Sequence, residues 1–402
     1  MSRMTAPHLS RMGTAVQESA TLRRAARARE LRAAGREIYN FTVGEPDYPT
    51  PDVVLAAAHR AIDEGHTRYT ATAGTPDLRA AVAEHYSARH RVPWRASQVM
   101  VSAGAKQVLW NALAATVDPG DEVVLIAPYW TSYLAYVQIL GGTPRILRPP
   151  RERNYKALGQ DLRTVLGPRT RAVLFNNPVN PTGAVYSEAE LRDLFEPIVD
   201  SDVWAVSDEI YERLVFEGEH HSPLQIYPEL QDRFVVATGA SKSFAMTGWR
   251  IGFGLGPESV VRSMISLQSH ITGNPNSVAQ RAALAALSVT DAQLEPMRRH
   301  FRERCDVALE VLATLPELRC TRPEGTFYLF LEVDAFFGEW SDGQRIDDCE
   351  GLADHLLEKH GIAVVPGTAF DHEGGVRVSC TLSPDEIRRG LGILVEALRQ
   401  RS

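Results

Sequence analysis

The chain has 402 residues, of which 44% are hydrophobic and 23% are charged, and these globular proportions exclude a disordered, collagen-like or coiled-coil protein. Its formal net charge of −7 gives no electrostatic reason to expect nucleic acid or an anionic membrane as a partner. The sequence has no apolar run of about 20 residues, no secretory h-region, and four cysteines without metal-binding or disulfide spacing. We therefore expect a cytoplasmic protein without a metal site.

The first three quarters of the chain alternate between strand-like and helical patterns. A loose arm is expected over residues 1–18, and a helix over 19–35 that ends at a glycine. Seven apolar, β-rich runs follow, at residues 99–102, 122–127, 144–147, 171–176, 204–208, 234–238 and 250–254. Helical patterns separate most of them, at residues 75–90, 105–117, 187–199 and 257–271. This alternation predicts an α/β fold whose mostly parallel sheet has helices on both faces.

The pattern changes after a long helical stretch at about 276–313. Runs at 326–333, 362–365 and 375–380 are typical of strands in a smaller α+β unit. We therefore predict two domains: a large one over residues 51–291, and a small one built from both chain ends, residues 19–50 and 292–402.

Ligands of open α/β sheets bind outside the carboxyl ends of the strands. The segments that follow the predicted strands are residues 104–106 (GAK), 128–130 (PYW), 176–183 (NNPVNPTG), 207–211 (SDEIY) and 239–243 (GASKS). We expect these five segments to meet in one crevice.

Lysine is scarce, because only four of the 43 basic residues are lysines: Lys106, Lys156, Lys242 and Lys359. A lysine that remains among so many arginines is a candidate for chemistry that a guanidinium cannot do, such as forming a Schiff base. Lys156 lies in a polar loop and Lys359 near the end of a charged helix, and neither needs such a role. Lys106 and Lys242 both follow predicted strands in turns of small residues.

Three other motifs predict little. GFGLG at 252–256 lacks the GxGxxG spacing of a dinucleotide loop, and GASKS lacks the glycine that precedes lysine in a phosphate loop. Nicotinamide and ATP binding are therefore poorly supported. The adjacent pair His220–His221 is predicted to lie in a solvated loop rather than in a metal site.

The strand-end segments together hold the parts of a cofactor site. Asp208 ends an apolar strand, where it is either a buried carboxylate or the cap of the following segment. Residues 104–106 open a helix directly after a strand, which is a site for an anion. With the amine of Lys242 and the aromatic ring of Trp130, these parts match the needs of pyridoxal 5'-phosphate (PLP).

Nearly the whole chain resembles the fold-type I, class I aminotransferases, and in particular their bacterial aspartate aminotransferase branch. The stretches that carry the resemblance include FTVGEPDYPTP (41–51), RYTATAGTPDLR (68–79), NPTG (180–183) and SKSFAMTGWRIGFGLGP (241–257). The resemblance implies a PLP-dependent transaminase of amino-acid metabolism.

The resemblance also implies roles for single residues. Lys242 would form a Schiff base with PLP and carry a proton, Asp208 would pair with the ring nitrogen, and Tyr211 with Asn180 would bond the phenolic oxygen. The other implied cofactor contacts are Gly104, Ala105, Lys106, Trp130, Ser241 and Arg250. Tyr69 is similar to a tyrosine that reaches the cofactor of a neighbouring subunit, which implies a homodimer with shared active sites.

The implied substrates are an amino acid and a 2-oxo acid, most simply aspartate and 2-oxoglutarate. Arg377 would grip the α-carboxylate and Lys106 the distal carboxylate, while the implied substrate contacts also include Gly44, Trp130 and Asn180. Departures from the family pattern occur at Ala105, Val179, His270 and Gly273.

Three alternatives stay open, and the departures bear on the first of them. The first is an aminotransferase for an aromatic or specialised biosynthetic amino acid. The second is elimination, replacement or cyclisation on the same cofactor, because a fold does not fix a reaction. The third is a regulator with an aminotransferase-like sensor domain. We expect no DNA-binding module here, since the resemblance begins by about residue 19.

Overall fold

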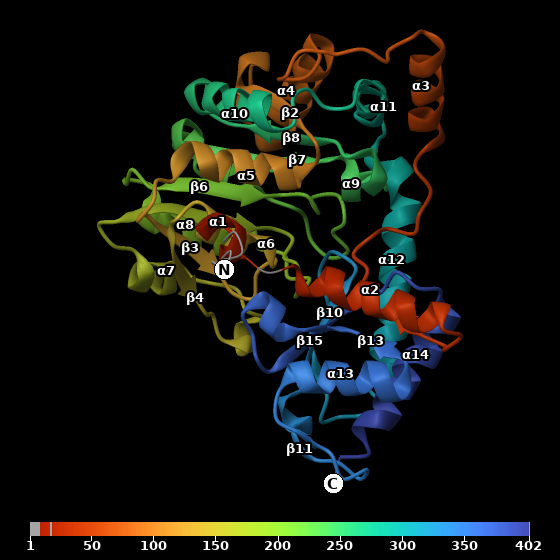
Figure 1. Ribbon diagram of the computed structural model, residues 1–402. Helices are drawn as coiled ribbons and strands as arrows, with labels where there is room; N and C mark the ends of the chain where they lie inside the picture. The colour runs from red at the N-terminus through yellow and green to blue at the C-terminus, as the bar shows by residue number, and fades with distance from the viewer. Residues whose placement is uncertain (1–8, 17, 402) are drawn as a thin grey trace, which may run out of the picture.

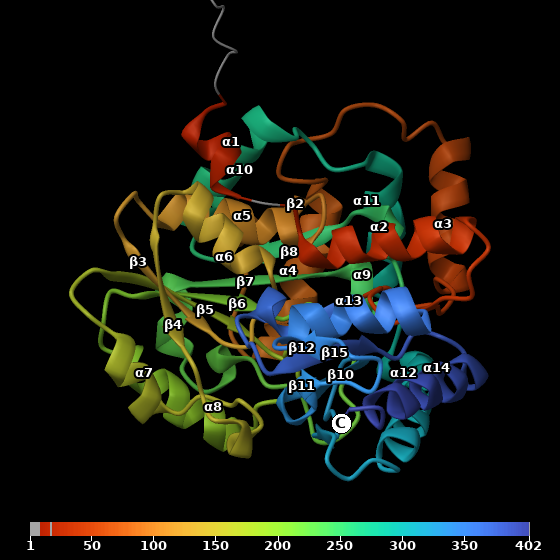
Figure 2. The ribbon, with the colours of Figure 1, turned by 60° about the horizontal axis from the view of Figure 1, so that its bottom comes forward.

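The computed structural model describes residues 9–16 and 18–401. Of the predicted arm, residues 1–8 and 17 lie outside this part, and the rest contains the short helix α1 (Arg11–Ala15). Helix α2 (Ala20–Ala33) follows and lies beside α13 (Cys349–His360), as Figure 2 shows. Arg24 of α2 donates hydrogen bonds of 2.6 Å to Asp354 and to Glu350 on α13. The start of the described chain is thereby attached to its last quarter.

A seven-stranded sheet forms the centre of the larger part, in the order β2-β8-β7-β6-β5-β3-β4 (Figure 1). Only β8 runs antiparallel to its neighbours, and the other pairs are parallel. The strands are β2 (Val99–Ser102), β3 (Glu122–Ile126), β4 (Thr143–Leu147), β5 (Thr170–Asn176), β6 (Trp204–Asp208), β7 (Phe234–Gly239) and β8 (Gly252–Leu255). The predicted α/β fold with a mostly parallel sheet is confirmed.

Alternate residues of these strands face two separate hydrophobic cores, because successive side chains of a strand point to opposite faces. Val173 and Phe175 of β5 pack with helices α4 (Pro76–His90) and α8 (Glu188–Phe195). Ala172 and Leu174 of the same strand pack with α5 (Ala105–Thr116), α6 (Ser132–Ile139) and α10 (Glu258–Ile271). Helices therefore cover both faces. Three further helices of this part are α3 (Asp52–Asp63), α7 (Gly159–Val165) and α11 (Ser277–Ala286).

The smaller part combines residues from both ends of the chain. Its four-stranded sheet has the order β14-β15-β10-β9, and two pairs, β1-β13 and β11-β12, lie beside it. The strands are β1 (Tyr39–Asn40), β9 (Arg319–Cys320), β10 (Tyr328–Glu332), β11 (Gly338–Glu339), β12 (Arg345–Ile346), β13 (Ile362–Ala363), β14 (Val365–Pro366) and β15 (Gly375–Ser379). Tyr39 and Phe41 share one core with α13 and with α14 (Pro384–Leu398).

Helix α12 (Asp291–Leu312) runs from the larger part into the smaller one (Figure 1). Its first half places Leu294, Met297 and Phe301 in a core with residues of α3 and α11. Its second half places Cys305, Ala308 and Leu312 in the core of the smaller part.

Several predicted bounds were wrong. The run 362–365 is two strands, because Ile362–Ala363 pairs with β1 and Val365–Pro366 with β15. The stretch 276–313 is two helices, α11 and α12, with a break between them at 287–290. The predicted strand 250–254 begins only at Gly252, since Arg250 has a left-handed φ of 55°.

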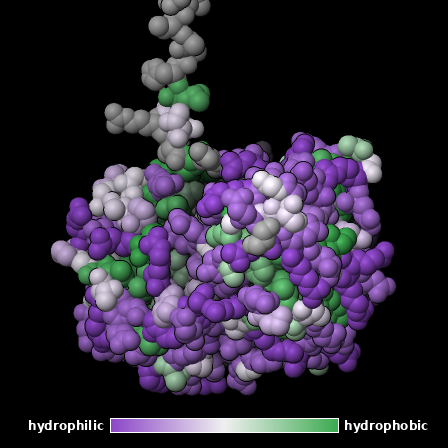
Figure 3. Space-filling model, turned by 90° about the horizontal axis from the view of Figure 1, so that it is seen from below, coloured by the Kyte–Doolittle hydropathy of each residue, from purple (hydrophilic) through white to green (hydrophobic). Residues whose placement is uncertain are grey.

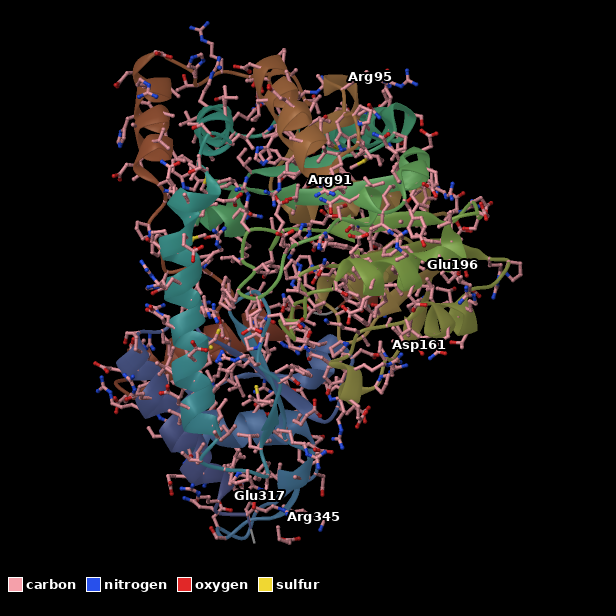
Figure 4. All side chains as sticks on the ribbon, turned by 180° about the vertical axis from the view of Figure 1, so that it is seen from behind. Arg91, Arg95, Asp161, Glu196, Glu317 and Arg345 are labelled. Carbon is pink, nitrogen blue, oxygen red and sulfur yellow. The ribbon has the colours of Figure 1, made fainter. Side chains whose placement is uncertain are left out.

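The surface carries many charged side chains. Figure 3 shows a mostly hydrophilic face with separate hydrophobic patches, and Figure 4 shows charged residues such as Arg95, Glu196 and Arg345 on widely separated elements. Within residues 9–16 and 18–401, no helix combines the length and the apolar character needed to span a membrane.

Candidate active site

A cavity of about 310 Å³ lies at the carboxyl ends of the parallel strands. All five strand-end segments contribute to it, so their predicted convergence is confirmed. Its lining includes Ala105, Lys106, Trp130, Asn176, Asn180, Asp208, Tyr211, Ser241, Lys242 and Arg250 from these segments and their neighbours, with Gly44 and Arg377.

Lys242 lies in the short helix α9 (Ala240–Ser243), directly after β7. Its Nζ donates a hydrogen bond to the carbonyl oxygen of Gly44, and lies 5.8 Å from the ring centroid of Phe327. Burial lowers the pKa of Lys242 to about 8, because an ammonium group loses its hydration there. The amine is therefore largely neutral in mildly alkaline solution, which is the nucleophilic form.

Asp208 ends β6 and is only 4% exposed. Tyr133 donates a 2.7 Å hydrogen bond to its Oδ2, and the backbone N–H of Ile210 donates to its Oδ1 at 3.2 Å. Burial nevertheless raises the pKa of Asp208 to about 6. No cationic side chain in the described ranges forms an ion pair with Asp208, so its carboxylate faces the cavity ready for a cationic partner.

An anion cradle forms where β2 leads into α5. Gly104 is the N-cap of α5 and has φ +90°, and a Cβ there would lie 2.7 Å from Nη2 of Arg250. Arg250 is held against this turn because Nη1 donates to the carbonyl of Thr247 at 2.9 Å and Nη2 to that of Ala103 at 3.3 Å. Unpaired N–H groups of the first helical turn, the guanidinium and Ser241 can bind a phosphate together.

Arg377 of β15 reaches the cavity from the smaller part. Its Nη1 donates to Asn180 Oδ1 at 3.1 Å, and its Nη2 to the carbonyl of Thr42 at 2.9 Å. The guanidinium lies 4.4 Å from the ring centroid of Tyr328, whose hydroxyl is 3.0 Å from that of Tyr211. Its buried Nε makes no hydrogen bond to the described residues and is available to an anion.

Lys106 and Trp130 form another wall of the cavity. Nζ of Lys106 lies 5.0 Å from the ring centroid of Trp130, a distance at which a cation is attracted to the ring face. Partial burial and the nearby Arg250 both lower the pKa of Lys106.

Sequence reasoning missed several residues of the cavity. Tyr133 follows Trp130 by three residues, which was the only local signal for it, and Tyr328 was hidden within a predicted strand. Ser19, Thr21 and Leu22 also line the cavity, although only a helix was expected there. Tyr69, in contrast, is 97% exposed and lies outside the cavity of its own chain.

The expectation for His220 was wrong, and the burial of Lys156 within its loop was not foreseen. The side chain of His220 is only 5% exposed and lies beside Glu209, so it is not solvated. Lys156 is buried, and its Nζ lies 3.1 Å from carboxylate oxygens of both Glu190 and Glu324. In both cases an acidic partner distant in sequence lies next to the basic group, which no local pattern indicates.

Comparison with known proteins agrees with this geometry. The family model for aminotransferase class I and II matches residues 36–394. The aspartate/prephenate aminotransferase of Cereibacter sphaeroides is 42% identical over 93% of this chain and 94% of its own, and that of Thermus thermophilus is 40% identical over 95% and 97%. The solved aspartate aminotransferase from Rhizobium meliloti superposes with a TM-score of 0.95 at 35% identity, covering 99% of this chain and 100% of its own.

The chain therefore belongs to the class I and II aminotransferases and is a PLP-dependent transaminase. The cavity fits that cofactor: a lysine whose pKa is lowered by burial, a buried carboxylate without a cationic partner in the described residues, and an anion cradle kept open by a glycine line the same space.

Proposed function

We propose that this aminotransferase exchanges the amino group of aspartate for the oxo group of 2-oxoglutarate. The observation that carries the proposal is that two cationic side chains, Arg377 and Lys106, line the same cavity as the amine of Lys242. A dicarboxylic amino acid can pair one carboxylate with each cation while its amino group meets the cofactor. The names of the relatives support this substrate class.

Bound PLP supplies a carbonyl group for amino-group exchange and a ring that accepts electrons from the substrate Cα. Lys242 would hold it covalently, and the buried carboxylate of Asp208 would pair with the protonated ring nitrogen. Gly104, Ala105, Ser241 and Arg250 would bind the phosphate.

The remaining residues orient the reactants. Asn180 and Tyr211 would donate hydrogen bonds to the phenolic oxygen of the ring, and Trp130 would stack on the ring. Arg377 and the backbone of Gly44 fix the α-carboxylate, and the amine of Lys242, once free, takes the proton from the substrate Cα. Lys106 distinguishes dicarboxylic from neutral substrates.

Prephenate is a second candidate substrate. It is a 2-oxo acid with a second carboxylate, so it meets the same two cations, and Leu22 and Leu109 add apolar lining that suits its ring. Both of the curated relatives described above carry this substrate in their names.

The active form is a homodimer in this proposal, and Tyr69 reaches the phosphate site of the partner subunit. Its exposure of 97% is unusual for a tyrosine, and Val53, Leu55, Ile62 and Ile271 are further exposed apolar residues. A cytoplasmic location is supported by the four cysteines, all of which are free.

An absorption spectrum of the purified protein tests the proposal, recorded before and after addition of L-aspartate without an oxo acid. We expect the yellow colour of bound PLP to bleach to the pyridoxamine phosphate spectrum, and 2-oxoglutarate to restore it. Release of ammonia instead would indicate elimination. A yellow protein that aspartate and glutamate leave unchanged would exclude dicarboxylic donors.

Replacement of Lys242 tests its assignment as the catalytic lysine. Lys242→Ala should abolish transamination while the far-ultraviolet circular dichroism stays unchanged, because the side chain occupies the cavity rather than a core. Borohydride reduction of the loaded wild-type protein should attach the cofactor to the peptide that contains Lys242. Turnover of the variant, or attachment at Lys106, would contradict the assignment.

A further inference from the structure

The larger and smaller parts also meet outside the cavity, at residues 148–156, which follow β4. Arg148 forms a 2.5 Å ion pair with Asp371, which lies between β14 and β15. The side chain of Tyr155 extends from the same segment to β10 of the smaller part. Neither Arg148 nor Tyr155 lines the cavity described above. The sheet that Tyr155 contacts is, however, the sheet that carries Arg377.

Tyr155 is held by its contacts in an unusual backbone conformation. Asn154 and Tyr155 have left-handed φ angles of 50° and 58°, which residues with a Cβ rarely adopt. The Tyr155 hydroxyl donates a hydrogen bond to Oε1 of Glu332, and Nε2 of His372 lies 3.1 Å from Oε2 of the same carboxylate. Burial and this carboxylate raise the pKa of Tyr155, so its hydroxyl keeps the hydrogen that it donates. The buried Glu332 is thereby bound to a side chain from each part.

A continuous series of aromatic contacts leads from Tyr155 to Arg377. The ring of Tyr155 meets that of Phe330 edge to face, with centroids 6.0 Å apart and planes at 84°. Phe330 meets Phe370 in the same way, at 6.1 Å and 88°. The guanidinium carbon of Arg377 lies 5.1 Å from the centroid of the Phe370 ring. Phe330 and Phe370 are 5% and 0% exposed, so neither ring can move without its neighbours.

These contacts bear on the orientation of the Arg377 guanidinium. A guanidinium donates two parallel hydrogen bonds to a carboxylate only when the two planar groups face each other in the right orientation. Two rings contact this guanidinium: that of Phe370, and that of Tyr328, whose hydroxyl lies 3.0 Å from the hydroxyl of Tyr211. The larger part therefore reaches the second ring through Tyr211, and the first through the series of contacts that begins at Tyr155.

We propose that Tyr155 is a positioning residue for transamination: through the two phenylalanine rings it fixes the plane in which Arg377 receives the α-carboxylate of the substrate. The proposal rests on the role of Arg377 in the proposed function but not on aspartate as the donor, because every amino acid carries an α-carboxylate. A contact made equally in the ground state and in the transition state changes substrate saturation and leaves the maximal rate unaltered. The effect of Tyr155 is therefore expected in the half-saturating substrate concentration.

The first half-reaction of the PLP-loaded holoenzyme tests the proposal, measured as the rate of bleaching at increasing concentrations of L-aspartate and of L-alanine. Tyr155→Ala should raise the half-saturating concentration of both amino acids by the same factor, at least tenfold, and leave the maximal rate within about twofold of the wild type. Tyr155→Phe keeps the ring and should raise it less, by about threefold. PLP affinity should stay unchanged in a spectroscopic titration, because the phosphate cradle belongs to the larger part.

Tyr227→Phe is the matched control for Tyr155→Phe. The Tyr227 hydroxyl donates at 2.8 Å to the carbonyl oxygen of Arg192, within the larger part, so this change should leave half-saturation and maximal rate as in the wild type. If Tyr155→Ala does not fold, Tyr155→Phe decides, and half-saturation equal to that of Tyr227→Phe would overturn the proposal.

Three results with Tyr155→Ala would also overturn the proposal. The first is half-saturation within twofold of the wild type, and the second is a change for aspartate without one for alanine. The third is a loss of PLP affinity of the same size, which would indicate a general structural effect. If the wild type converts alanine but not aspartate, the proposed donor is wrong, and the alanine series still decides the role of Tyr155.

Discussion

Burial changes the acid–base behaviour of the two residues at the centre of the cavity. The pKa of Lys242 falls to about 8 and that of Asp208 rises to about 6, since each charged form loses hydration. The amine thereby becomes available as a nucleophile, and the carboxylate becomes a strong binder of a cationic ring. Both shifts result from positions at strand ends, which the sequence predicted, and from burial, which the sequence indicated for Asp208 but not for Lys242.

Asp208→Asn should weaken PLP binding without lowering the stability of the PLP-free protein. Because burial raises its pKa, Asp208 destabilises the PLP-free protein once the pH exceeds about 6, by an amount on the order of 1–3 kcal/mol, and this cost disappears as the pH falls toward 4. The PLP-free variant should therefore melt at or above the wild-type temperature at pH 8, with a smaller difference at pH 5. Its affinity for PLP should fall at least tenfold.

Thermal melts at the two pH values and a spectroscopic PLP titration measure these effects. A PLP-free variant that is less stable than the wild type at pH 8, yet equally stable at pH 5, would contradict the argument.

Lys106→Ala should reduce kcat/KM for aspartate by about 10–100-fold, the usual effect of losing a charge-assisted contact. The same change should alter kcat/KM for alanine less than about threefold, since alanine has no distal carboxylate. Lys359→Ala, at an exposed position on α13, is the control and should behave as wild type. Equal losses for both substrates would remove the proposed role of Lys106.

At the level of elements, strands buried on both faces were predicted well. The bounds of β2 and β6 agree with the prediction, because continuous apolar runs between polar turns leave little choice. The short strands β13 and β14 were predicted as one, since their partners β1 and β15 come from opposite ends of the chain. Pairing between distant segments has no local signal.

The site was predictable to a similar extent. Lys242, Asp208 and Asn180 lie in strand-end segments, where the rule for parallel sheets applies. Tyr328 reaches the cavity only because β10 pairs with β15 beside Arg377. His220 likewise lies beside a distant segment, because Nε2 of His90 on α4 and Nε2 of His220 lie 3.4 and 3.7 Å from the same oxygen, Glu209 Oε2.

Gly104→Ala tests whether the glycine at the N-cap of α5 is needed for the phosphate cradle. Its φ of +90° is strained for alanine, and the new Cβ would lie 2.7 Å from Arg250 Nη2, so the phosphate cradle should distort. We expect PLP affinity to fall at least tenfold. Gly248→Ala is the control, because Gly248 has open space around its α-carbon and no positive φ. A spectroscopic titration compares the PLP affinities of the two variants. Equal affinities would contradict the proposal that the turn at Gly104 binds the phosphate.

At the scale of the whole molecule, shared active sites predict complementation between two inactive variants. Tyr69→Ala and Lys242→Ala homodimers should each be impaired, the first in PLP affinity and the second in turnover. A heterodimer holds one site with both residues intact, so random mixing should restore activity at about a quarter of the sites. The assay is turnover at limiting PLP after subunit exchange, and no recovery despite exchange would contradict the arrangement of Tyr69.

The division into domains stays a proposal, with boundaries near residues 50 and 291. It is supported by the separate cores on either side of α12 and by the joint packing of Tyr39 with the carboxyl-terminal helices.

Helix α12 connects the two halves of the site. Its 22 residues span about 33 Å, so a tilt of about 5° at one end would displace the other by about 3 Å. Arg377 would move with the part at the far end, whereas Lys242 would stay with the central sheet. A rigid rotation of this kind would change the distance between the guanidinium of Arg377 and the amine of Lys242 without breaking strand pairing in either sheet.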